Sequence, residues 1–168
     1  LLGCVDEKKA IKGIPWGTLI LIVGVGLLVN VITELGGIEL ISEFLISMMN
    51  EHTATPILAA TSGILSWVSS TTGVVMPTLY PIAADIASNF GPSVSYVELI
   101  SAVTATSFAA AISPRSTGGA IIISSYSAAK ELDTAQQNKL FKTLFLLSVA
   151  NVGVHVLLSA FGLFNLLG

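Results

Sequence analysis

The sequence has little charge and almost no cysteine. Only 10% of its 168 residues are charged, against about 25% in a typical soluble domain, whereas 53% are hydrophobic. A soluble fold of this size cannot hide so much apolar surface, so we expect a membrane protein. Cys4 is the single cysteine, which excludes a disulfide framework and a thiolate metal cluster. The net charge of −3 is weak and scattered, which argues against a nucleic-acid partner.

The usual motifs of enzymes are also missing. The sequence has no hydrolytic triad, P-loop or metal-ligand cluster, and Gly24-Val25-Gly26 lacks the strand–turn–helix context of a dinucleotide-binding turn. These absences predict a protein that is not an enzyme and holds no organic cofactor. The chain starts at Leu1 without the basic start and apolar core of a signal peptide, so we expect it to be part of a longer polypeptide.

Apolar runs predict an all-α membrane protein. Residues 14–32 form a run of 19 residues without a charge, about 28 Å as a helix, which is enough to cross a bilayer. After a break at residues 33–37, residues 38–50 separate glutamates from apolar positions, which predicts an amphipathic helix lying in the interface. Residues 130–138 predict a charged loop, and residues 141–167 predict a last spanning helix.

Between these spans the sequence predicts two interrupted elements. Residues 56–88 form two apolar arms around the polar tip Ser69-Ser70-Thr71-Thr72-Gly73. Each arm is about half of the roughly 20 residues that a spanning helix needs, which predicts a re-entrant helical hairpin. Residues 95–129 predict one spanning helix broken at residues 113–119, because Pro114 cannot continue a helix.

The lysines predict the orientation in the membrane. All six lie at two places, within residues 8–12 and 130–142, before the first and the last span. Both places fall on one side whether residues 56–88 re-enter or span twice, and the positive-inside rule makes that side cytoplasmic. We therefore expect a multi-pass protein of the cytoplasmic (inner) membrane, with the hairpin open to the outer face and the C-terminus outside.

The two breaks carry similar hydroxyl and glycine residues. At each break one half-helix ends with unpaired carbonyl groups, suited to a small cation such as Na⁺, and another begins with unpaired N–H groups, suited to an anion. The expected substrate-binding residues are Ser70, Thr71, Thr72, Gly73, Arg115, Ser116, Thr117 and Gly118. The expected Na⁺ ligands are Ser69, Ser70, Thr71, Ser113 and Thr117.

Each of these assignments has a structural alternative. A single hydroxyl-rich kink often bonds only to its own backbone or to a neighbouring helix, and it is the matching of two breaks that favours a binding site. Arg115, the only arginine, is costly inside a broken helix. It either neutralises a substrate carboxylate, snorkels toward the cytoplasm or pairs with an acid elsewhere.

A known group has similar residues at three places: Ile14-Pro15-Trp16-Gly17, Ser69-Ser70-Thr71-Thr72-Gly73-Val74-Val75-Met76-Pro77 and Ser113-Pro114-Arg115-Ser116-Thr117-Gly118-Gly119-Ala120. The chain thus resembles the ion-transporter superfamily, most of all the malonate or dicarboxylate carrier-like permeases and more distantly the divalent anion:sodium symporters. The resemblance implies the C-terminal half of a homodimeric transporter in which two inverted repeats meet around substrate and sodium. It further implies a scaffold part at residues 1–55 and half of an elevator-like transport domain at residues 56–168.

The resemblance also implies roles for the breaks. Residues 69–72 lie where the symporters have a Ser-Asn-Thr motif, and residues 116–118 line the second sodium site and the substrate pocket. No asparagine stands at the tip here, and both Na⁺ and H⁺ stay open as the coupling ion. We expect a secondary active transporter of small organic anions, with dicarboxylates as the expected substrates. The expected partners are membrane lipid, an N-terminal repeat, a second copy and the anionic substrate.

Two alternatives remain open at this point. One is a proton-linked or exchange carrier for another anion, such as an inorganic oxyanion. The other is a non-transporting membrane scaffold subunit.

Overall fold

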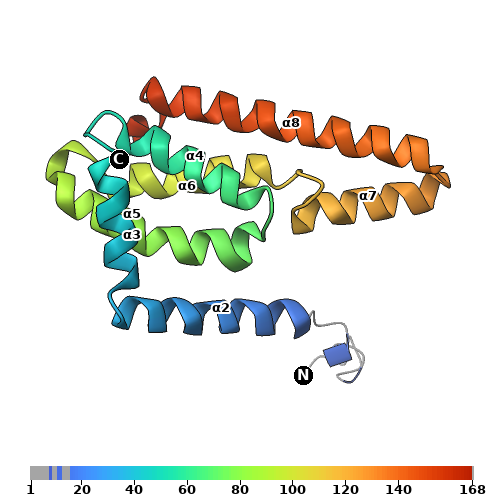
Figure 1. Cartoon of the computed structure of the whole chain (residues 1–168), viewed down its shortest axis with the longest axis horizontal. Helices are drawn as coiled ribbons and strands as arrows, with labels where there is room; N and C mark the ends of the chain where they lie inside the picture. The colour runs from blue at the N-terminus through green and yellow to red at the C-terminus, as the bar shows by residue number, and fades with distance from the viewer. Residues whose placement is uncertain (1–7, 9–10, 13–15, 168) are drawn as a thin grey trace, which may run out of the picture.

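The computed structural model describes residues 8, 11–12 and 16–167 of the chain. Seven α-helices and three short helices of other types make up the described part, which confirms the all-α prediction. The helices are α2 (Trp16–Glu34), α3 (Gly37–Ser47), α4 (Ala54–Ser66), the π-helix η1 (Thr71–Val75), α5 (Met76–Phe90), the 3-10 helix η2 (Gly91–Ser93), α6 (Tyr96–Ala110), α7 (Thr117–Lys130), α8 (Thr134–Ala160) and the 3-10 helix η3 (Leu163–Leu167). Most of them lie along one long axis, and α3 crosses it (Figure 1).

Helix α2 leads into the amphipathic helix α3 through a sharp bend. The helix predicted at residues 14–32 is α2, Trp16–Glu34, and its crossing of the membrane stays a prediction; residues 14 and 15, like Cys4, fall outside the described residues. The two helix axes differ in direction by 77°. Gly36 permits the bend because its φ of 75° lies in the left-handed region that glycine adopts without strain. Helix α3 then buries Ile38 and Leu45 against α5 and leaves its other apolar face exposed.

Within the described part of the chain, α8 is the one helix long and apolar enough to cross a membrane, and the bent α2–α3 pair is a second candidate. Helix α8 has 27 residues and measures about 40 Å. The bounds predicted for it were wrong at both ends. Residues 134–138 are helical and not a loop, because Asp133 and Gln136 form a capping box that starts the helix at Thr134. The helix stops at Ala160, shortly before Gly162 turns the chain with a φ of 75°.

Residues 54–90 form a helical hairpin. Helix α4 runs to the middle of the long axis, the chain turns at residues 67–70, and η1 and α5 run back (Figure 1). With 13 residues, about 20 Å, α4 is too short to cross a bilayer. The second arm is longer than predicted: Asn89 and Phe90, expected in a loop, continue α5 until Gly91, whose φ is 58°.

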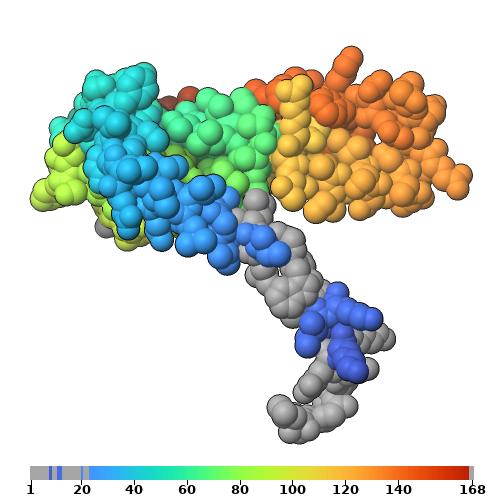
Figure 2. Space-filling view, turned by 60° about the horizontal axis from the view of Figure 1, so that its bottom comes forward, coloured from blue at the N-terminus to red at the C-terminus, as the bar shows by residue number. Residues whose placement is uncertain are grey.

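Helices α6 and α7 run in the same direction on either side of an irregular segment. Helix α6 ends at Ala110, earlier than predicted, and α7 begins at Thr117, so residues 117–119 form a helical turn where the sequence predicted part of the break. Pro114 lies in the intervening segment, where it costs no helical hydrogen bond. Helix α8 returns alongside both halves, and its junction with α7 lies beyond the other helices (Figure 2).

Small side chains let α4 pack closely against α6 and α8. Ala59, Ser62 and Ala102 are fully buried at this contact. A Cβ added to Gly63 would lie 2.7 Å from a methyl group of Val152. The backbone of α4 at Gly63 therefore packs directly against a side chain of α8. Close packing through small residues is typical of helices in membranes. It holds the end of α4, and with it the hairpin tip, against α6.

The arrangement is compatible with the predicted orientation. The turn between α7 and α8, near Lys130 and Lys139, lies toward the same end of the long axis as the start of α2 (Figure 1). The open end of the hairpin and the end of α8 lie at the opposite end. Which end faces the cytoplasm stays a prediction from the lysines.

Candidate functional site

A cavity of about 250 Å³ lies between the hairpin tip and the segment that separates α6 from α7. Both turns lie near the middle of the long axis (Figure 1). The residues that line the cavity are Ser69, Ser70, Thr71, Thr72, Phe108, Ala111, Ser116, Thr117, Gly118 and Ile121. The structure therefore brings the two predicted breaks together on one cavity.

The hairpin tip begins its second arm with a serine cap. Ser70 is in an extended conformation, and its hydroxyl oxygen accepts the N–H of Gly73 at 3.1 Å. This bond satisfies the third N–H of the new helix, as an N-cap serine does. The N–H groups of Thr71 and Thr72 precede the first intrahelical bond and have no acceptor within the helix.

The second break repeats this geometry. Ser116 is extended and its hydroxyl oxygen accepts the N–H of Gly119 at 3.1 Å. The N–H groups of Thr117 and Gly118 are again the first two of their helix and lack an intrahelical acceptor. Gly119 is required by close approach, since a Cβ there would lie 1.9 Å from the carbonyl oxygen of Ser113.

Two helix N-termini therefore open onto one cavity. Helix η1–α5 leaves it toward one end of the molecule and α7 toward the other, so the positive ends of both helix dipoles point inward (Figure 1). None of the lining residues carries a charge. An anion in the cavity would meet helix dipoles, hydroxyl groups and free N–H groups without a carboxylate to repel it.

The carbonyl groups at the breaks are more fully engaged than predicted. The carbonyl oxygen of Ser113 accepts the N–H of Ser116 at 2.9 Å and its hydroxyl at 2.8 Å. Among the described residues, no hydrogen bond reaches the carbonyl oxygens of Val68, Ser69 or Ile112. Free carbonyl groups thus remain at both breaks, although Ser113 does not provide one.

The predicted residues divide into those that line the cavity and those that do not. Seven of them line it: Ser69, Ser70, Thr71, Thr72, Ser116, Thr117 and Gly118. Gly73 is buried and outside the lining, and Ser113 is buried with its hydroxyl donated to the carbonyl of Trp67 at 2.8 Å. Arg115 is exposed and outside the lining. Their roles in binding stay predictions.

Sequence reasoning missed other residues around the cavity. Phe108, Ala111 and Ile121 line it with apolar surface. Ser66 and Ser107, both fully buried, connect the tip to α6. Ser66 is the last residue of α4 and Ser107 lies in the last turn of α6, where the helix leaves a carbonyl free that the Ser66 hydroxyl can reach.

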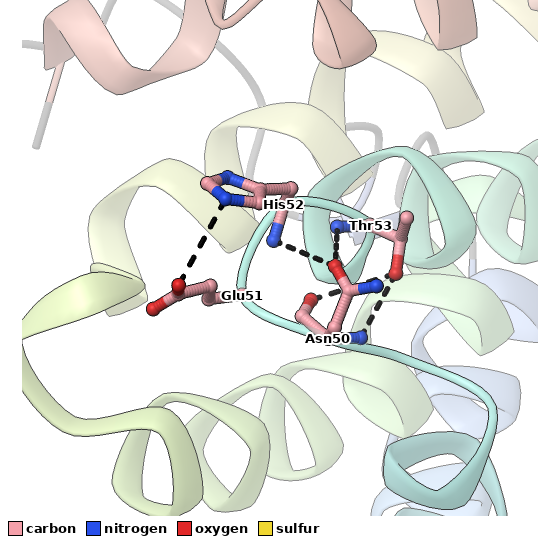
Figure 3. A network of polar contacts seen from close by, with 4 residues as sticks. All are labelled: Asn50, Glu51, His52 and Thr53. Carbon is pink, nitrogen blue, oxygen red and sulfur yellow. Dashed lines mark hydrogen bonds and ion pairs between the residues drawn. The ribbon is translucent and has the colours of Figure 1, made fainter.

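A second cavity, of about 340 Å³, lies at the open end of the hairpin. Its lining residues are Glu51, His52, Thr55, Ser93, Glu98, Ser159, Ala160, Gly162 and Asn165. In the turn before α4, the side-chain oxygen of Asn50 accepts the N–H of His52 at 3.0 Å, and His52 Nε2 lies 3.8 Å from a carboxylate oxygen of Glu51 (Figure 3). Buried Glu98 accepts a hydrogen bond from the hydroxyl of Thr55. None of the predicted site residues lies there.

Comparison with known families identifies the kind of protein. Residues 1–112, which include the hairpin tip and all of α6, match the family described as citrate transporter (CitMHS). The chain belongs to the citrate transporter family. It is thus a transporter-family membrane protein of the ion-transporter superfamily and not an enzyme. Comparisons with curated proteins and with solved structures give no match.

Only part of the cavity lies within the match to the citrate transporter family. The match includes residues 69–72 but ends before Ser116 and α7. The pairing of the two serine-capped helices therefore rests on the structure alone.

Proposed function

We propose that this chain forms the anion-binding part of a secondary active transporter that moves small organic anions across the cytoplasmic membrane. The observation that carries the proposal is the pair of helix N-termini capped by Ser70 and Ser116 on one uncharged cavity. Membership in the citrate transporter family supports an organic anion as the substrate.

A substrate with two or more carboxylates fits this arrangement. The N–H groups of Thr71 and Thr72 bind one carboxylate, and those of Thr117 and Gly118 bind another. The hydroxyls of Thr72 and Thr117, on exposed residues of the lining, add further hydrogen bonds. Each helix N-terminus stabilises a negative charge by roughly 0.3–1 kcal/mol, and by up to about 2 kcal/mol where water is partly excluded. Dicarboxylates and citrate are therefore the proposed substrates.

The coupling ion is proposed to be Na⁺ rather than H⁺. Small hard cations prefer oxygen ligands, and Ser69, Ser70, Thr71 and Thr117 bring hydroxyl oxygens to the lining. The free carbonyl oxygens of the hairpin tip are further candidates. No lining residue titrates near neutral pH, so a coupled proton would have to bind elsewhere or travel on the substrate.

The larger assembly follows the family resemblance. We propose that residues 56–168 move as part of a transport domain against residues 1–55, that the hairpin opens to the outer face, and that the C-terminus lies outside. An N-terminal repeat and a second copy would complete the dimer. The exposed apolar side chains of α2 and α8, among them Leu27, Leu28 and Leu146, suit lipid or such protein partners.

The test is uptake of labelled citrate and malonate by the protein in proteoliposomes, with and without an inward Na⁺ gradient. Thr117→Val should raise the KM about tenfold or more by removing a hydrogen bond to a charged group. Thr143→Val is the matched control, since the Thr143 hydroxyl donates only to Lys139 of its own helix at 2.9 Å.

The outcomes separate the alternatives. Uptake that ignores Na⁺ but follows a proton gradient contradicts the sodium proposal. Uptake of sulfate or phosphate in place of organic acids supports the oxyanion carrier. No uptake of any of these anions by a correctly inserted protein supports the scaffold alternative.

A further inference from the structure

Ser66 joins the hairpin tip to α6 through a buried hydrogen-bond cluster. It is the last residue of α4 and fully buried. Its hydroxyl donates to the carbonyl oxygen of Ser107 at 2.8 Å and lies 2.6 Å from the hydroxyl oxygen of Thr71. The Thr71 hydroxyl lies 3.2 Å from the same carbonyl. Because the single proton of Ser66 is donated to Ser107, Thr71 acts as donor toward Ser66.

The carbonyl of Ser107 is available because α6 ends one turn later. The N–H of Ala111, which would continue the helix, donates to Phe108 at 3.1 Å and not to Ser107. A carbonyl left without a donor at membrane depth is costly, since no water reaches it. The hydroxyl of Ser66 supplies the donor that the helix lacks.

A second bond holds the other side of the tip. Ser113 donates its hydroxyl to the carbonyl oxygen of Trp67 at 2.8 Å. Residues 68–70 are thus held between a bond at Trp67 and the cluster at Thr71. Two of these three, Ser69 and Ser70, line the cavity.

We propose that Ser66 is a positioning residue for anion binding: it fixes Thr71, the first residue of the cavity-lining helix η1, against the end of α6. Ser66 itself does not line the cavity. The proposal rests on the proposed transport function and adds that the tip and α6 keep one fixed geometry. Substrate affinity then depends on a residue behind the site.

Ser62 offers a matched control. It lies one turn earlier on the same helix, is equally buried, and donates its hydroxyl to Ala59 of its own helix at 2.8 Å. Removing either hydroxyl deletes one oxygen atom from a fully buried serine of α4. Only Ser66 connects two elements.

The experiment measures KM and maximal rate of citrate uptake by the reconstituted protein for wild type, Ser66→Ala, Ser66→Cys and Ser62→Ala. Ser66→Ala is expected to raise the KM on the order of tenfold, with the maximal rate within about twofold, while Ser62→Ala changes neither by more than about twofold. Ser66→Cys keeps a weak S–H donor of similar size and should fall between wild type and Ser66→Ala.

Three results would overturn the positioning role. They are equal KM values for Ser66→Ala and Ser62→Ala, a lower maximal rate at unchanged KM, and a KM of Ser66→Cys as high as that of Ser66→Ala. If Ser66→Ala does not insert, the KM of Ser66→Cys is compared with that of wild type. A raised KM supports the positioning role, and an unchanged KM contradicts it. Absence of organic-anion uptake by wild type is a separate result that contradicts the transport function itself.

Discussion

Replacing Gly119 by alanine should displace the start of α7 and weaken substrate binding. The added Cβ would lie 1.9 Å from the carbonyl oxygen of Ser113 and 2.7 Å from that of Ile112. Ordinary contact begins at 3.4 Å, so the backbone must move by about 1.5 Å, the difference between 3.4 and 1.9 Å. Neither obstacle is a side chain that can rotate away.

The expected cost has two parts. Overpacking of this kind costs about 1–3 kcal/mol. Loss of the cap that Ser116 provides to the N–H of Gly119 adds about 1 kcal/mol. The two parts sum to roughly 2–4 kcal/mol. If only about 1.4 kcal/mol of this cost falls on substrate binding, the affinity changes tenfold. Gly119→Ala should therefore raise the KM for citrate at least tenfold and lower the thermal unfolding temperature.

The assay combines thermal unfolding in detergent with uptake in proteoliposomes. Gly153→Ala is the control, because a Cβ on Gly153 of α8 meets no atom within 4 Å. There alanine should stabilise the helix by about 0.5–1 kcal/mol. If Gly119→Ala shows the same KM and unfolding temperature as Gly153→Ala, the close approach at the second break is refuted.

Three further predictions concern stability, each measured by thermal or denaturant unfolding in detergent. Thr55→Val leaves the carboxylate of buried Glu98 without its hydroxyl donor and should cost about 1–3 kcal/mol, whereas an unchanged unfolding midpoint would contradict the contribution of this bond. Asp133→Ala removes the capping box with Gln136 and should cost about 1 kcal/mol, a loss that Asp133→Asn should largely avoid. Glu131→Gly should instead stabilise the protein by about 1 kcal/mol, because Glu131 has a φ of 51°; destabilisation would contradict this account.

Local patterns in the sequence were sufficient to predict the two breaks. A serine followed three residues later by glycine occurs at residues 70–73 and 116–119, and both serines cap helices. Short arms around a hydroxyl-rich tip predicted the hairpin for a similar reason: too few apolar residues are available to span. These predictions depend on the chemistry of the segment itself.

Two other features could not be predicted from local sequence. Ser66 and Ser107 are 41 positions apart, and their bond depends on how α4 packs against α6. The composition of residues 130–138 predicts a charged loop, whereas α8 starts within this segment because Asp133 and Gln136 have the spacing of a capping box. The exposure of Arg115 likewise follows from the turn between α6 and α7, which the residue types alone do not specify.

The central claim is that both breaks bind the same anion. It is tested most directly by maleimide labelling of Thr72→Cys and Thr117→Cys, each in a Cys4→Ser background, with and without citrate. Both positions are exposed residues of the cavity lining, and exposed Ser125, which lies outside the lining, provides the control Ser125→Cys. The account predicts that citrate slows labelling at both positions of the lining and leaves Ser125→Cys unchanged. Protection at only one of the two, or at neither, would contradict a shared site.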